Sequence, residues 1–169
     1  MAARVAASAG LEHVDAGRIF RHLAVDHGLD LAAFGRYAAE HPEVDVELDA
    51  RMAERGRAGG VVLEGRLAGW VATREGLPAV RVWVACQDEV RAARVAEREG
   101  LEVAGAAAQN AAREVTERGR YLRIYGIDLA DTSIYDLVLD STSTGPEALA
   151  AAVLAAVPGG TRGAEGVRE

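Results

Sequence analysis

The stretch Val61-Val62-Leu63-Glu64-Gly65-Arg66-Leu67-Ala68-Gly69-Trp70 decides the fold of this 169-residue chain. Its first residues form a short apolar run that is typical of a buried strand, and the residues after Arg66 have a helical pattern. Glu64 and Arg66 therefore come at the carboxyl end of a predicted strand, which is where open parallel sheets bind ligands. Gly65 would let the backbone approach a ligand closely, and a guanidinium fork matches a phosphate. The alternative is a strand that simply ends in a surface ion pair.

Apolar, β-branched runs alternate with helical patterns along the rest of the chain. We expect strands at residues 11–14, 61–64, 80–85 and 137–139. This alternation predicts an α/β fold with a parallel sheet and helices on both of its faces. The helices within residues 16–58 are long for one crossover and are expected to form a subdomain over the sheet edge. The glycine-rich tail from Pro158 is predicted to be disordered.

The composition limits the possible function. The net charge of −7 argues against a protein that coats nucleic acid or an anionic membrane. The single cysteine, Cys86, cannot form an internal disulfide, and no Cys/His spacing is typical of a metal site. No apolar run is long enough to span a bilayer, so we expect a cytoplasmic protein, and a monomer is the simplest expectation. The chain contains no lysine, so every positive side chain is an arginine.

Polar side chains follow three of the predicted strands. Asp15, Arg66 and Asp140 all come at strand carboxyl ends, and they are predicted to converge on one crevice. Arg21 lies on the helix that leaves this crevice. The alternative interpretation is that Arg21 is an ordinary solvated arginine on a helix.

A second group of arginines lies on a long predicted helix at residues 103–125. Its members are Arg113, Arg118 and Arg120, with Arg123 as a weaker candidate, and Glu114 and Glu117 partly neutralise them. An exposed, salt-bridged helix face is one interpretation, and each such pair contributes only ~0–1 kcal/mol. An arginine offered to a phosphoryl group in transfer is worth about 10³–10⁵ in rate. Because the helix leads into a glycine-containing loop, a mobile lid is the other interpretation.

The chain resembles the cytidylate kinase family in its compact archaeal form. Four stretches carry this resemblance, and they are specific as a set: residues 14–21 (VDAGRIFR), 41–45 (HPEVD), 63–70 (LEGRLAGW) and 120–138. It extends over nearly the whole chain, to about residue 157.

The resemblance implies a P-loop kinase fold that transfers the γ-phosphoryl group of ATP to CMP or dCMP with Mg²⁺. It implies one domain at residues 1–157, with nucleotide-binding helices at residues 16–58 and a lid at about residues 113–133. Asp15, Arg21, Gly65 and Arg66 would hold the acceptor nucleotide. The catalytic residues would be Arg113, Arg118 and Arg120, which would neutralise charge on the phosphates. No protein metal ligand, nucleic acid or membrane partner is expected.

The chain departs from this family at its start. The family begins with a strand and a G-x-x-x-x-G-K-[ST] loop that cradles the ATP phosphates, and this sequence contains neither that motif nor a lysine. We therefore expect the sequence to be truncated, an expectation that an in-frame stop codon close before Met1 would defeat. The chain as printed is expected to be weakly stable and nearly inactive.

Two other interpretations stay open. In the first, the chain is a non-catalytic remnant that binds the acceptor nucleotide but not ATP. In the second, the arginine helix is a nucleic-acid interaction module, which the net charge disfavours.

Overall fold

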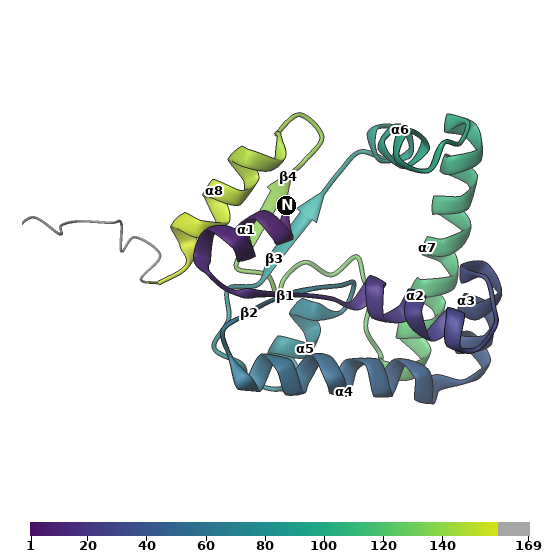
Figure 1. Cartoon of the computed structure of the whole chain (residues 1–169), viewed down its shortest axis with the longest axis horizontal. Coiled ribbons are helices and arrows are strands. Elements are labelled where there is room, and N and C mark those ends of the chain that lie inside the picture. Colours follow the sequence, from purple (N-terminus) through teal and green to yellow (C-terminus); the bar gives the residue numbers. More distant parts are fainter. Residues whose placement is uncertain (159–169) are drawn as a thin grey trace, which may run out of the picture.

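The computed structural model describes residues 1–158. Beyond Pro158, the tail that was predicted to be disordered lies outside the described residues. The elements in chain order are α1 (Ala2–Ala9), β1 (Glu12–Asp15), α2 (Ala16–Asp26), α3 (Leu31–Glu40), α4 (Pro42–Ala58), β2 (Val61–Glu64), α5 (Ala68–Arg74), β3 (Val82–Ala85), α6 (Asp88–Glu99), α7 (Val103–Tyr125), β4 (Leu137–Asp140) and α8 (Pro146–Ala156) (Figure 1).

The strands form two separate parallel pairs. β1 pairs with β2 in a register that places Asp15 opposite Glu64, and β3 pairs with β4 so that Ala85 lies opposite Asp140. The parallel direction predicted from the alternation of strands and helices is confirmed. The expectation of one sheet is not, because no backbone pairing joins β2 to β3 within residues 1–158. Each strand is therefore paired along one edge only.

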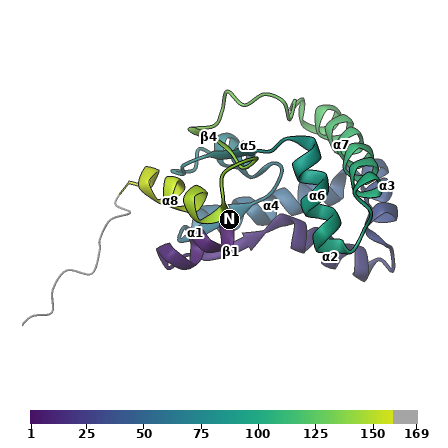
Figure 2. The same ribbon diagram turned by 90° about the horizontal axis from the view of Figure 1, so that it is seen from above.

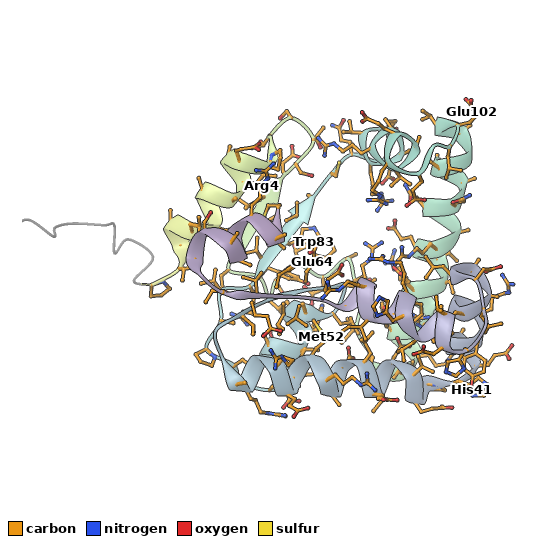
Figure 3. The ribbon with its side chains drawn as sticks, viewed as in Figure 1. Arg4, His41, Met52, Glu64, Trp83 and Glu102 are labelled. Carbon is orange, nitrogen blue, oxygen red and sulfur yellow. The ribbon has the colours of Figure 1, made fainter. Side chains whose placement is uncertain are left out.

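Helices cover both faces of the strands, as predicted. Successive side chains of a strand point to opposite faces. On one face, Leu63 packs in a core that includes Met52 of α4 and Val71 of α5, and Figure 3 shows Met52 between α4 and the strands. On the other face, Val62 packs against Val5 of α1 and Val153 of α8.

The second core also links the two sheets. Val62 of β2, Val82 of β3 and Leu139 of β4 all pack against the same buried residues of α1 and α8. Burying a large aliphatic side chain contributes roughly 1.5–3 kcal/mol. This shared cover therefore holds the two strand pairs together without backbone hydrogen bonds between them.

Local sequence signals set several helix ends. The Asp30 carboxylate accepts a hydrogen bond from the Ala33 amide at 2.7 Å and caps α3. Gly126 ends α7 with φ of 69°, a left-handed conformation that glycine adopts without strain. Pro42 is the first residue of α4, because proline fits the first turn of a helix. Asp88 is the first residue of α6, and Gln87 occupies the cap position.

Helices α2 and α3 of the predicted subdomain and helix α7 lie at one end of the molecule, whereas α4 runs beneath α5 and the strands. Figures 1 and 2 both place α2, α3 and α7 at the end opposite α8. α6 packs along α7, and the lower half of α7 contacts α3. Within residues 1–158, no helix is both long and apolar enough to cross a membrane.

Candidate functional site

The carboxyl ends of β1 and β2 lie side by side and bring the start of α2 against the turn after β2. A Cβ atom added to Gly65 would lie 2.8 Å from the Cβ atom of Ala16, which is closer than side chains pack. Gly65 therefore allows a close approach, but the group that approaches it in the structure is the first residue of α2. This contact and the pairing of Asp15 with Glu64 place Asp15 beside the turn that begins at Gly65.

Glu64 and Arg66 do not pair with each other. Glu64 Oε2 lies 2.6 Å from Nε2 of His13 on β1. Arg66 Nε lies 3.0 Å from Oε2 of Glu117, which belongs to α7. The turn after β2 is thus tied to the long helix, and the local ion pair of the simpler interpretation does not form.

Asp15 and Arg21 form the second part of this region. Asp15 stands at the N-cap position of α2 but makes no capping hydrogen bond. Its Oδ2 atom instead lies 3.5 Å from a terminal nitrogen of Arg21, one of whose terminal nitrogens also lies close to Gly17. More than half of the Arg21 side chain is exposed, so its guanidinium can reach a ligand at the strand ends.

One buried carboxylate brings Arg66 and Arg113 together. The two Glu117 oxygens contact different arginines: Oε1 accepts a hydrogen bond from Arg113 Nε at 2.7 Å, and Oε2 forms the ion pair with Arg66 Nε. The Glu117 side chain is 8% exposed, whereas those of Arg66 and Arg113 are 40% and 50% exposed. Two predicted site residues from distant parts of the chain therefore meet at one point.

Arg120 points in a different direction. Its Nε lies 2.9 Å from Asp45 Oδ2, and its terminal nitrogens donate to the Gly35 carbonyl and the Tyr121 hydroxyl. Both partners of the Asp45–Arg120 pair are almost fully buried. Burial raises the pKa of Asp45 to about 6 despite the attraction of Arg120, and burial likewise raises the pKa of Tyr121 to about 12. In this conformation Arg120 joins α7 to α3 and α4.

Two further predicted residues lie apart from the Arg66–Arg113 pair. Arg118 forms an exposed ion pair with Asp128 at 3.1 Å, in the segment that follows α7. Asp140 belongs to the other sheet and accepts a hydrogen bond from the Thr142 amide within its own turn. Hydrogen bonds from the side chain and the amide of Thr142 lower the pKa of Asp140. The structure gives Asp140 no contact with Asp15 or Arg66, so the three strand ends do not form one cluster of contacting side chains.

Sequence reasoning gave no role to Asp45 and regarded Glu117 only as a neutralising charge. The four-residue spacing of Arg113 and Glu117 on a helix indicates their pairing. By contrast, the partners Arg66 and Asp45 are far from α7 in the sequence, and no local pattern indicates either contact.

A pocket of about 330 Å³ has Asp15 in its lining. It is lined by Glu12, His13, Val14, Asp15, Arg18, Ile19, Arg51, Glu54 and Arg55. Its acidic and basic side chains balance, and its lining includes none of Arg21, Arg66 and Arg113. The arginines that were predicted to bind phosphate therefore lie outside this pocket. Within residues 1–158, no three His, Cys, Asp or Glu side chains are grouped to hold a metal ion.

Comparison with known proteins agrees with the resemblance. Residues 1–143 match the sequence profile of the Cytidylate kinase-like family. The chain is 46% identical over 154 residues to a cytidylate kinase of Pyrococcus horikoshii, covering 91% of this chain and 79% of that protein. It is 45% identical over 149 residues to a cytidylate kinase of Methanopyrus kandleri, covering 84% of this chain and 77% of the relative. The chain belongs to the cytidylate kinase-like family.

Proposed function

We propose that this protein transfers the γ-phosphoryl group of ATP to CMP or dCMP and forms CDP or dCDP. The names of its relatives support a cytidylate kinase activity. The preference for cytosine rests on the names of those relatives alone. A cytoplasmic location and a monomeric state stay predictions.

The observation that carries this proposal is the meeting of Arg66 and Arg113 on Glu117. Phosphoryl transfer asks the protein mainly to position the phosphates and to stabilise their negative charge. Arg66 and Arg21, near the ends of β2 and β1, are suited to hold the acceptor phosphate, with Gly65 and Asp15 shaping that end of the sheet. Arg113 is suited to neutralise charge on the phosphoryl group in transfer.

Arg118 and Arg120 are proposed to join the transfer step only after a change in the position of α7. In the present conformation Asp128 holds Arg118, and Asp45 holds Arg120. Lid helices of kinases move between open and closed positions, so both arginines stay candidates for contact with the phosphates.

The sequence offers fewer candidate residues for binding ATP than for binding the acceptor nucleotide. The sequence contains no glycine-rich loop with a lysine to cradle the ATP phosphates. Mg²⁺ is proposed to arrive bound to ATP, as part of that substrate. We therefore expect turnover by this chain to be slow compared with a kinase that carries such a loop.

The direct test is chromatographic detection of CDP after incubation of the purified chain with MgATP and CMP, with dCMP, UMP and AMP in parallel. We expect CDP and dCDP to form faster than UDP or ADP. CMP binding without any CDP would favour the non-catalytic remnant. Absence of both binding and turnover would overturn the proposal.

A further inference from the structure

We infer that Glu117 is a positioning residue, which holds Arg66 and Arg113 as one phosphate-binding unit. This inference rests on the proposed function, since it assigns the two arginines to nucleotide phosphates. It adds a residue whose own carboxylate touches neither substrate.

The first observation is the division of one carboxylate between two arginines. Oε1 serves Arg113, four residues earlier on α7, and Oε2 serves Arg66, in the turn after β2. Each arginine uses its Nε atom in this contact. Glu117 thus connects a helix of the predicted lid to the end of a strand.

The second observation concerns the hydrogen-bond donors of the two arginines that make no contact with Glu117. The terminal nitrogens of Arg66 and Arg113 donate no hydrogen bond to any residue within 1–158, whereas both terminal nitrogens of Arg120 are bound. A phosphate is recognised through several guanidinium N–H groups at once. The Nε contacts therefore hold both guanidinium groups at Glu117 and leave their outer donors for an anion.

The third observation is electrostatic. Two guanidinium groups at one point repel each other, and an anion between them makes their approach favourable. The Glu117 side chain is almost fully buried, so solvent weakens this attraction less than it does for an exposed pair. The Glu117 Oε2 atom is buried and accepts no directed hydrogen bond, so its contact with Arg66 is an ion pair without a fixed hydrogen-bond direction. Arg66 can consequently adjust its plane to a phosphate without losing the ion pair.

A positioning role makes a specific prediction about the phosphate group of the ligand. Glu117→Gln keeps the shape of the side chain but removes its charge. We expect it to weaken CMP binding about tenfold, because misplaced binding groups lose much of their effect, and to leave binding of cytidine, which has no phosphate, unchanged. Isothermal titration with CMP and with cytidine gives the ratio of the two affinities, which is called the CMP-to-cytidine ratio below. A general loss of stability would weaken both affinities and leave this ratio unchanged.

The matched control is Glu114→Gln. Glu114 lies on the same helix and accepts a hydrogen bond from Arg91 of α6 at 2.8 Å, away from Arg66. Its substitution is expected to leave the CMP-to-cytidine ratio unchanged. A second comparison introduces Glu117→Gln into a protein that already carries Arg66→Gln. There it should weaken CMP binding by clearly less than tenfold, because one of the two arginines that Glu117 positions is already absent.

The outcomes separate this inference from the proposed function. If the unaltered chain does not bind CMP, the proposed function fails. If it binds CMP and Glu117→Gln leaves the CMP-to-cytidine ratio unchanged, the inference alone is wrong. Tighter CMP binding by Glu117→Gln would also overturn it, because the carboxylate would then compete with the phosphate for the arginines. If Glu117→Gln does not fold, Glu117→Asp, which keeps the charge but withdraws the carboxylate from both arginines, must lower the affinity for CMP relative to that for cytidine.

Discussion

Gly65 is the residue at which sequence and structure give different reasons for the same requirement. The sequence suggested that glycine is needed there so that a ligand can approach the backbone closely. The structure shows that Ala16 of α2 already occupies the space next to Gly65. Both reasons exclude a side chain. The contact with Ala16 is the one that fixes the start of α2 against β2.

Gly65→Ala is accordingly expected to destabilise the protein by about 1–3 kcal/mol, the usual cost of forcing extra volume into a packed site. Gly105→Ala on α7 is the control, because an added Cβ there meets no atom within 4 Å, and alanine favours a helix by roughly 0.5–1 kcal/mol. Urea unfolding of both variants measures the difference. Equal stability of the two variants would show that the Gly65 contact is unimportant.

Asp45 makes the stability of the protein depend on pH. Burial raises the pKa of this carboxyl from 3.8 to about 6 in the folded state. The folded protein therefore binds this proton more tightly than the unfolded chain does. The contribution of Asp45 to the free energy of unfolding consequently falls as the pH rises from 3.8 to about 6, and it is constant above that range.

The measurement is the difference in unfolding free energy between the unaltered chain and Asp45→Asn, recorded from pH 4 to pH 8. We expect the unaltered chain to lose on the order of 2–3 kcal/mol relative to the variant between pH 4 and pH 6. Taking the difference removes the contribution of the other carboxylates. A flat difference would mean that Asp45 titrates alike in both states.

At the scale of elements, α7 is held by two kinds of arginine contact. The Asp45–Arg120 pair is buried and fixes α7 to α4. Arg118 forms an exposed pair with Asp128 in the segment that follows α7. Removing one partner of a buried pair leaves an uncompensated charge, which is far more costly than the loss of an exposed pair.

Arg120→Met should therefore destabilise the protein by about 3–5 kcal/mol, and Arg118→Met by ~1 kcal/mol at most. Replacing both partners of the buried pair, as in Asp45→Leu with Arg120→Met, should recover part of the loss, since no charge then stays buried. Denaturant titration of the three variants tests this. Similar costs for Arg118→Met and Arg120→Met would contradict a fixing role for Arg120.

The elements themselves were largely predictable. α7 extends over Val103–Tyr125 as the helical pattern indicated, and the four strands lie where short β-branched runs end in an acidic or small residue. Such features depend on neighbours in the sequence. The contacts of Arg66 with Glu117 and of Arg120 with Asp45 depend on how distant elements pack, and a helical spacing places Arg113 and Arg120 on one face without deciding which partner each one meets.

At the scale of the whole molecule, the separation of β1–β2 from β3–β4 limits stability. Within residues 1–158 side-chain contacts through α1, α8 and α5 link the pairs, and one edge of every strand is without a backbone partner. We expect the unfolding free energy to lie at or below the lower end of the ~5–15 kcal/mol typical of native proteins. Differential scanning calorimetry measures it, and a sharp, high-temperature melt together with rapid ATP turnover would contradict this expectation.

The overall arrangement brings side chains from β1, β2 and α7 toward one end of a parallel pair, and it is there that the acceptor nucleotide is proposed to bind. Isothermal titration of the chain with CMP tests this most directly, with Arg66→Gln as the variant and Arg98→Gln as a control. Arg98 is exposed on α6, and among residues 1–158 it pairs only with its neighbour Glu99. We predict that CMP binds, that Arg66→Gln weakens binding about tenfold or more, and that Arg98→Gln leaves it unchanged. Absence of CMP binding, or equal affinity in all three proteins, would contradict the proposed acceptor site.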